Sequence, residues 1–255
     1  MRAYAITSTA LLGLVSGIAC GSSTDAPKAG SSCNPTCADG GTPSGVAPPT
    51  SGHNVNPDGV AYPVPAGGYG HSPRSGNIRG NVIQNFKFLG YPDPTNTSSG
   101  LQTISLADYY DPCQKRYKLL HLTVAGVWCT PCNMETDAIV AAKSQLASEN
   151  IIVLQALDDG PVMGTPAGVR DLNNWLNLHH PTFPEMLDPG LYNLGGFFNA
   201  SAIPWNADID VRTMEILTSS VGEEDPTTDF IAPLALVTPS GTSGQPGYSI
   251  PVTCK

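Results

Sequence analysis

The strongest constraint on the fold is an apolar run that ends directly at a pair of cysteines. The run, residues 119–127, is nearly continuous and has β-branched members, which is typical of a buried strand in a partly parallel sheet. It is followed by Trp-Cys-Thr-Pro-Cys at residues 128–132 and by a stretch, residues 133–148, whose apolar residues recur at helical spacing. The sequence therefore predicts that Cys129 and Cys132 lie at a turn from a strand to a helix.

Strand and helix patterns alternate along the rest of the chain. A second buried strand is predicted at residues 151–157, and a helix at residues 168–178. Shorter strand-like elements are expected at residues 83–88, 104–106, 182–187, 207–211 and 214–218. The last two should form a terminal hairpin, and the whole pattern favours an α/β fold with a mixed sheet.

Residues 1–19 have the features of a secretion signal. A basic residue and an apolar stretch are followed by small residues up to the expected cleavage point. Ala19-Cys20-Gly21 resembles the end of a bacterial lipobox, with Gly17 where that motif prefers leucine. We expect an exported protein of the periplasm or cell envelope that is lipid-anchored at Cys20; a soluble exported protein is the alternative. No later segment offers the ~20 apolar residues that a membrane-spanning helix needs.

Composition divides the mature chain into three parts. Residues 20–80 are crowded with Gly, Pro, Ser and Thr and show no periodicity, so they are predicted to form a disordered tether. One folded domain is expected at residues 81–222. An irregular extension is expected at residues 223–255, where several prolines occur.

Four of the seven cysteines are available for structural disulfides. Export places them in an oxidising compartment, where disulfides persist. Once the lipidation site and the pair at the strand end are set aside, Cys33, Cys37, Cys113 and Cys254 remain, and they allow three pairings. We favour Cys113 with Cys254, which would tie the front of the domain to its tail, and Cys33 with Cys37.

The cysteine pair at the strand end could be half a zinc site, a structural disulfide or a redox couple. Zinc would need two more ligands at comparable spacing. The other close pair, Cys33 and Cys37, lies in the predicted tether, and the histidines are scattered. We therefore expect neither a metal nor a cofactor.

A redox couple gives each position of the motif a role. A helix that begins within the motif directs its unpaired N–H groups and its positive dipole end toward Cys129, which favours the thiolate. Cys129 is therefore the predicted nucleophile, and Cys132, one turn into the helix, would resolve the mixed disulfide. Pro131 suits the first helical turn, where its missing N–H costs nothing. Trp128 could shield the site or be a plain core aromatic.

Two further residues could serve this chemistry. Glu135 follows Cys132 by three residues and lies on the same helical face, where it could accept the proton of the resolving thiol. It could equally be an exposed acid that complements the helix dipole. Ile203-Pro204 precedes the terminal hairpin, and its peptide bond is a candidate for the cis form.

Together these residues resemble the thioredoxin-like proteins of the extracytoplasmic TlpA/ResA type and the related redoxin (AhpC/TSA-like) domains. The likeness covers roughly residues 81–220, a length typical of one domain. It implies a thioredoxin-like fold, with a central mixed sheet flanked by helices. Residues 85–89 resemble the β extension at the N-terminus of redoxin domains.

The resemblance also implies roles for individual residues. Pro204 matches the family's cis-proline, which packs beside the cysteines and offers backbone groups to the substrate peptide. Glu135 matches the acid that follows the second cysteine by three. The catalytic residues would then be Cys129, Cys132 and Glu135. Substrate contact is expected at Trp128, Pro131, Ile203 and Pro204.

The chain departs from the family at several positions. Asp137 stands where the family usually has a proline that kinks the helix. Trp205 and Asn206 follow Pro204, in place of small hydroxyl residues. The buried acid of ordinary thioredoxins would fall near Thr123, which cannot transfer a proton. Prolines beyond residue 222 imply that the usual closing helix is short, irregular or absent.

The activity implied is thiol–disulfide exchange, in either direction, with exported proteins and an upstream thiol redox partner. A thiol peroxidase is an alternative, but the residues before Cys129 lack the Pro-x-x-x-Thr-x-x-Cys pattern. A copper-binding module on the same fold is another, and it would need His179 or His180 to reach the cysteines. With 12 Lys+Arg against 21 Asp+Glu and no basic run, nucleic acid is not an expected partner. Membrane contact is expected only through the lipid anchor.

Overall fold

The computed structural model of the chain describes residues 46–198, 202–237 and 254. The described residues belong to one compact unit. The predicted signal peptide, the predicted lipidation site Cys20 and the predicted disulfide between Cys33 and Cys37 lie outside these residues. Among the described residues, no helix has the length and apolar character needed to cross a bilayer.

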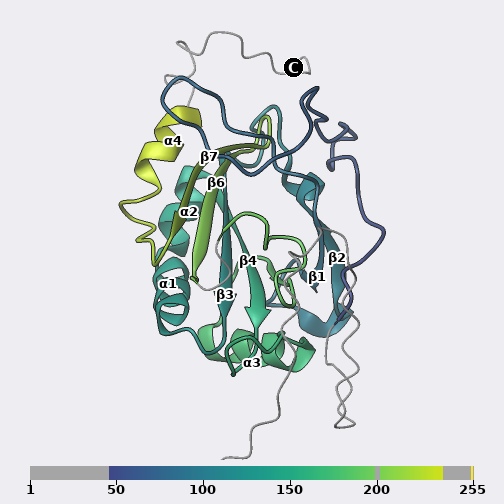
Figure 1. Ribbon diagram of the computed structural model, residues 1–255, viewed down its shortest axis with the longest axis vertical. Helices are drawn as coiled ribbons and strands as arrows, with labels where there is room; N and C mark the ends of the chain where they lie inside the picture. Colours follow the sequence, from purple (N-terminus) through teal and green to yellow (C-terminus); the bar gives the residue numbers. More distant parts are fainter. Residues whose placement is uncertain (1–45, 199–201, 238–253, 255) are drawn as a thin grey trace, which may run out of the picture. The chain divides into compact units, whose positions relative to one another are not determined.

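The centre of the unit is a seven-stranded mixed sheet in the order β2-β1-β5-β4-β3-β6-β7 (Figure 1). Strands β3, β4 and β5 run parallel, whereas β6 is antiparallel to β3 and β7 to β6. Strand β1 pairs antiparallel with both β2 and β5. The strands are β1 (Lys87–Tyr91), β2 (Gln102–Ser105), β3 (Leu119–Gly126), β4 (Ile151–Asp159), β5 (Glu185–Leu187), β6 (Trp205–Asp210) and β7 (Glu215–Val221).

This topology confirms the predicted thioredoxin-like α/β fold and its N-terminal β extension. The extension is the β1–β2 hairpin, and the terminal hairpin is β6–β7. The helix predicted at 133–148 is two helices, since the chain breaks regular structure at Ala142. The helices are α1 (Thr130–Ala141), α2 (Lys143–Glu149), α3 (Val169–His179) and α4 (Ile231–Val237), with 3-10 turns at Thr97–Ser99 and Leu106–Tyr109.

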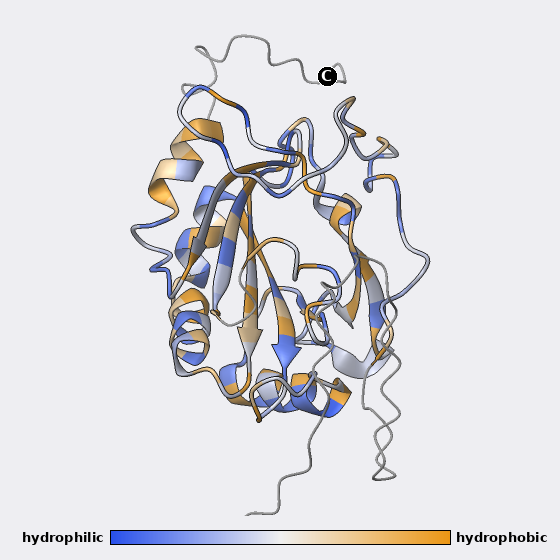
Figure 2. Ribbon diagram, in the orientation of Figure 1, coloured by the Kyte–Doolittle hydropathy of each residue, from blue (hydrophilic) through white to orange (hydrophobic). Residues whose placement is uncertain are grey.

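One face of the sheet packs against helices. Alternate residues of β3 and β4 point to this face, as the period of two requires. Leu119 of β3 and Val153 of β4 share a buried cluster with Ile139 of α1, Leu146 of α2 and Val237 of α4. Figure 2 shows that α4 is mostly hydrophobic, whereas α1 carries both kinds of residue. Each such side chain stabilises the fold by about 1.5–3 kcal/mol through its burial.

The opposite face of the sheet is covered by the segment before β1, which contradicts the predicted tether. Leu120 and Leu122 of β3 lie in one buried cluster with Tyr62 and Ile83. The Tyr62 hydroxyl donates a hydrogen bond to the Ile83 carbonyl oxygen at 2.9 Å, and the Asn56 amide donates one to the backbone. The prediction that the tether extends to residue 80 is therefore wrong for residues 46–80, because a chain without regular structure still buries its aromatic side chains.

The same segment is fastened to the edge of the sheet. Arg74 and Arg79 form ion pairs with Glu215 of β7 at 2.9 and 3.2 Å, and that carboxylate is only 1% exposed. The backbone N–H of Arg74 donates to the Ile216 carbonyl, and the N–H of Ile216 donates to the carbonyl of Asn81. The outer edge of β7 is thus covered along this stretch, which protects it from pairing with another chain.

The segment after β7 is also more regular than the composition predicted. Residues 231–237 form α4, and the Phe230 ring packs against the ring of His121 with centroids 4.2 Å apart. A disulfide joins Cys113 to Cys254, which confirms that predicted pairing. The irregular extension expected at 223–255 is therefore wrong for residues 231–237, whose apolar side chains find a place on the helical face of the sheet.

Candidate functional site

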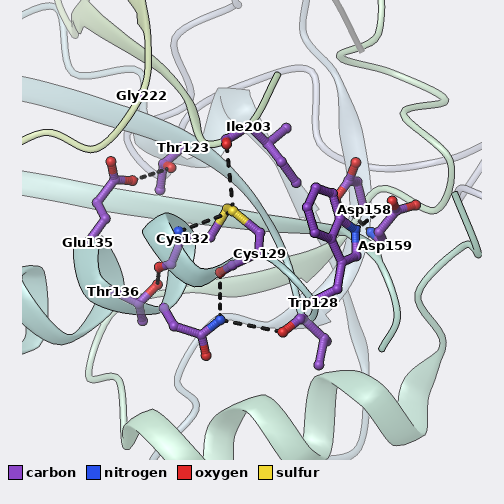
Figure 3. The surroundings of a disulfide bond; sticks show 12 residues. Thr123, Trp128, Cys129, Cys132, Glu135, Thr136, Asp158, Asp159, Ile203 and Gly222 are labelled. Carbon is purple, nitrogen blue, oxygen red and sulfur yellow. Dashed lines mark hydrogen bonds between the residues drawn. A yellow bond between two sulfur atoms is a disulfide. The ribbon is translucent and has the colours of Figure 1, made fainter. Parts of the chain in front are cut away.

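The predicted cysteine pair lies at the turn from β3 into α1, in the disulfide form (Figure 3). The backbone N–H of Cys129 donates to the Gly126 carbonyl at 3.0 Å, which closes the turn. Cys129 is the N-cap of α1: its sulfur accepts the N–H of Cys132 at 3.2 Å. Pro131 lies in the first turn, as predicted. A helix N-terminus directed at Cys129 stabilises a thiolate on its sulfur.

The segment before β6 brings a second part of the predicted site to the sulfur atoms. The Ile203–Pro204 peptide bond is cis, as the resemblance implied. The Ile203 carbonyl oxygen lies 3.6 Å from Cys129 Sγ (Figure 3). This proximity follows from the sheet, because Val124, near the end of β3, pairs with Trp205, the first residue of β6.

Trp128 is held by the loop that follows β4. Its indole Nε1 donates to Asp159 Oδ2 at 2.9 Å, and the same oxygen accepts the N–H of Gly164. Trp128 and Ile203 both pack against the cluster that contains the cysteines. They leave no room at Gly126, where a Cβ would lie 2.9 Å from Ile203 Cδ1 and 3.2 Å from Trp128 Nε1. A larger residue at the end of β3 would therefore have to displace the Ile203 and Trp128 side chains.

The Glu135 carboxylate is completely buried behind the cysteine pair. Oε1 accepts a hydrogen bond from the Thr123 hydroxyl at 2.8 Å. Oε2 accepts one from the Asn206 amide and one from the backbone N–H of Glu224, both at 2.9 Å. Burial raises the pKa of Glu135 and outweighs the lowering effects of the His121 charge and of these hydrogen bonds. The alternative of an exposed acid at the helix start is therefore excluded.

Two departures from the family pattern turn out to be the partners of Glu135. Thr123 lies near the position expected for the buried acid of ordinary thioredoxins, and Asn206 follows the cis-proline by two residues. Both donate hydrogen bonds to the Glu135 carboxylate, and they face each other across the β3–β6 pair. The Glu135 carboxylate of α1 thus lies against the Thr123–Asn206 pair, and both strands donate hydrogen bonds to it.

Asp137, the third departure from the family pattern, belongs to a chain of hydrogen bonds that reaches the start of α1. Asp137 Oδ1 lies 2.7 Å from Nδ1 of His179, whose Nε2 lies 3.1 Å from Asn133 Oδ1. The Asn133 amide in turn donates to the carbonyl oxygen of Cys129 at 2.7 Å. Both ring nitrogens of His179 are thus engaged, and His180 lines a separate pocket beside Tyr91. Neither histidine presents the ligand to the cysteines that a copper-binding module would need.

Asp158 is a further buried acid near the site, which the sequence did not single out. It lies near the end of β4, beside Asp159 and Trp128 (Figure 3). Burial and the charge of Asp159 raise its pKa to about 7, against a backbone hydrogen bond that lowers it. The only signal in the sequence is the pair of acids that ends an apolar run.

Behind Glu135 lies a second group of titratable side chains. One nitrogen of His121 and one carboxylate oxygen from each of Asp208 and Glu224 lie within 4.8 Å of one another. His121 Nδ1 already hydrogen-bonds to Asp208 at 3.0 Å, which leaves fewer ligands than the four that zinc prefers. We therefore interpret the group as a buried ion pair with a neighbouring acid. In the sequence, this group could have been noticed from Asn206 and Asp208, two polar residues that alternate with apolar ones in a buried strand.

No family model matches the sequence, and no curated protein does. Among solved structures, the chain is similar to a secreted thiol-disulfide isomerase from Corynebacterium glutamicum, with 19% identity, coverage of 66% of this chain and 96% of that one, and a TM-score of 0.47. A DsbF homologue from Corynebacterium diphtheriae is 19% identical over 65% of this chain and 96% of that one, with a TM-score of 0.43. StoA from Bacillus subtilis is 15% identical over 56% of this chain and 92% of that one, with a TM-score of 0.40. This likeness concerns the fold and assigns no activity.

Proposed function

We propose that the protein is a thiol–disulfide oxidoreductase whose chemistry lies on Cys129 and Cys132. The observation that carries the proposal is the cysteine pair at the N-terminus of α1, with the Ile203 carbonyl oxygen 3.6 Å from Cys129 Sγ. The helix end stabilises a thiolate, and the backbone at Ile203 is proposed to bind an extended substrate peptide beside the sulfur.

In the reducing direction, the Cys129 thiolate attacks one sulfur of a substrate disulfide. An S–S bond forms between Cys129 and the substrate, and the other substrate sulfur leaves as a thiolate. Cys132 then loses its proton and attacks the Cys129 sulfur, which closes the protein disulfide and releases the second substrate thiolate. Two electrons have passed from the protein to the substrate, and the reverse sequence oxidises a dithiol.

We assign the proton of Cys132 to Glu135. A carboxylate one turn further along the same helix lies on the same face as the thiol. Its pKa, raised by burial, makes it a better base for a thiol than an ordinary carboxylate. Thr123 and Asn206 hold it in place.

Substrate contact is proposed for the residues around the sulfur atoms. Trp128 and Ile203 form the apolar part, and Pro131 and Pro204 shape the backbone on either side of Cys129. The substrates are proposed to be exported proteins, because the sequence begins with the features of a secretion signal. Lipidation of Cys20 and re-reduction or re-oxidation by an upstream thiol partner are parts of the same proposal.

The function is tested by reduction of insulin with the purified protein, compared with its Cys129→Ser variant. The wild type should accelerate precipitation of the insulin B chain well above the thiol background, and the variant should not. Serine cannot form the mixed disulfide, so the loss should be complete. Equal rates for the two proteins, or no acceleration by the wild type, would remove the basis of the proposal.

Gly126→Ala should disturb the site without removing any of its reactive groups. The added methyl group forces Ile203 and Trp128 apart by a few tenths of an ångström or more, and overpacking of this kind costs about 1–3 kcal/mol. We expect several-fold slower insulin reduction and a lower free energy of unfolding. Gly67→Ala is the matched control, since the space around Gly67 is open. A Gly126→Ala variant as active as this control would show that the position of Ile203 does not matter.

A further inference from the structure

The helical face of the sheet holds a fully buried histidine that the exchange chemistry does not use. His121 lies in the middle of β3, and its side chain has no exposed surface. Nδ1 lies 3.0 Å from Asp208 Oδ1 on the neighbouring strand, and the Thr218 hydroxyl donates to the other oxygen of Asp208. Nε2 is buried without a hydrogen-bond partner. Nε2 lacks a hydrogen bond in either protonation state, so it is the surrounding carboxylates that favour the protonated imidazole.

The titratable groups that face His121 come from three different elements. Asp208 is on β6, Glu224 follows β7, and Glu135 is on α1. All three carboxylates favour the charged imidazole electrostatically. Two apolar residues also adjoin His121: Val153 of β4 lies opposite in the sheet register, and the Phe230 ring lies against the imidazole.

Glu224 connects this group to Glu135 and to the surface. Its backbone N–H donates to Glu135 Oε2 at 2.9 Å, and its own carboxylate pairs with the Ser220 hydroxyl. It also lines an open groove of about 580 Å³ between the helices α1 and α2 and residues 223–227. His121 is thus deep in the protein, and Glu224 lies next to both His121 and the Glu135 carboxylate.

We propose that His121, held as a cation by Asp208, is a positioning residue that keeps Glu135 ionised and ready to take the proton of Cys132. The inference rests on the proposed function and concerns how His121 controls the ionisation of Glu135 in that same site. The His121 charge lowers the pKa of Glu135, and it opposes the effect of burial. Burial lowers the pKa of His121 itself, but the hydrogen bond and charge of Asp208, with Glu224 and Glu135, outweigh it and raise that pKa. Asp208, Glu224 and Glu135 thus favour the charged form of the imidazole.

The test separates the two thiol steps by reaction of the reduced protein with the aromatic disulfide dithiobis(nitrobenzoate) (DTNB). Release of the aromatic thiolate is monitored by stopped-flow absorbance. The reduced protein releases one aromatic thiolate when Cys129 attacks the reagent. It releases a second when Cys132 gives its proton to Glu135 and displaces the thiolate from Cys129. The second step is intramolecular, so its rate does not depend on the reagent concentration. Its pH profile reports the proton acceptor.

His121→Asn should slow the second phase several-fold at pH 7, because a smaller fraction of the acceptor Glu135 is ionised without the His121 charge. The loss of the cation raises the pKa of Glu135, so the rate should recover to the wild-type value at higher pH. Asp208→Asn keeps the imidazole and its contact with Phe230 but removes the group that holds its proton. It should shift the profile in the same direction, and it serves as the test if His121→Asn does not fold. The first phase should stay within about twofold of the wild type in both.

His53→Asn is the matched control. His53 also pairs with an aspartate, Asp108 at 2.6 Å, but it is exposed and lies in the segment before β1. This variant should keep the wild-type profile. Second-phase rates that fall equally at every pH, or an unchanged profile in both His121→Asn and Asp208→Asn, would overturn the inference. Failure of the wild type to release any thiolate would instead contradict the proposed function.

Discussion

The Cys132→Ser variant will stop halfway through the exchange and accumulate a covalent complex with its substrate. Cys129 remains at the N-terminus of α1 and can still attack a disulfide, because the helix end still stabilises its thiolate. Serine offers no thiolate to displace the substrate, so the mixed disulfide persists. In single-turnover mixing with an oxidised peptide, we expect release of the second thiolate to fall by about three orders of magnitude or more.

The complex is measured by mass spectrometry of the unreduced mixture, with one peptide expected for each protein molecule. Cys129→Ser is the control and should form no such complex. If this control formed the adduct and Cys132→Ser did not, the roles of the two cysteines would be reversed. If Cys132→Ser released both thiolates at the wild-type rate, the residue would have no resolving role.

Loss of the second disulfide should have the largest effect on stability. Cys113 and Cys254 are separated by 141 positions, so their bond closes a loop that spans most of the folded unit. In the chain-entropy model, a cross-link over so long a loop restricts the unfolded chain strongly, and removal of such a bond costs about 2–4 kcal/mol. We expect the paired variant Cys113→Ser with Cys254→Ser to lose this amount in denaturant unfolding, with a steeper dependence on denaturant because the unfolded chain without the cross-link exposes more surface.

The chain supplies its own control for this experiment. Cys129 and Cys132 are three positions apart, so their disulfide restricts the unfolded chain far less. The paired variant Cys129→Ser with Cys132→Ser should therefore lose clearly less stability. Equal losses in the two paired variants would mean that loop closure does not explain the effect.

Local patterns in the sequence were enough to predict the central strands and the position of the cysteine pair between β3 and α1. The apolar run of β3 followed by Cys129 and a helical period leaves little choice of local structure, and the terminal hairpin follows from two short strands around a turn. The cis bond before Pro204 was expected from the family likeness and not from the residues themselves. These features depend on neighbours in the sequence, which is why a single sequence reveals them.

Contacts between distant segments could not be predicted in this way. Residues 46–80 have the composition of a linker, and only the folded sheet shows that Tyr62 fits beside β3. The surroundings of Glu135 are a second example. Its donors Asn206 and Glu224 are 71 and 89 positions away, and the register that brings them together is a property of the whole sheet. The sequence showed the acid but not what holds it.

The backbone bond from Glu224 to Glu135 has a consequence for the order in which the protein is made. A chain is synthesised from its N-terminus, so Cys129 and Cys132 exist long before residue 224 does. Until that residue arrives, the carboxylate behind the cysteines lacks one of its donors, and the neighbourhood of His121 lacks Glu224 and the Phe230 ring. The cysteines of a nascent chain are thus present without their finished surroundings. The hydrogen-bonded surroundings of Glu135 are complete only once residue 224 has been synthesised, near the end of the chain.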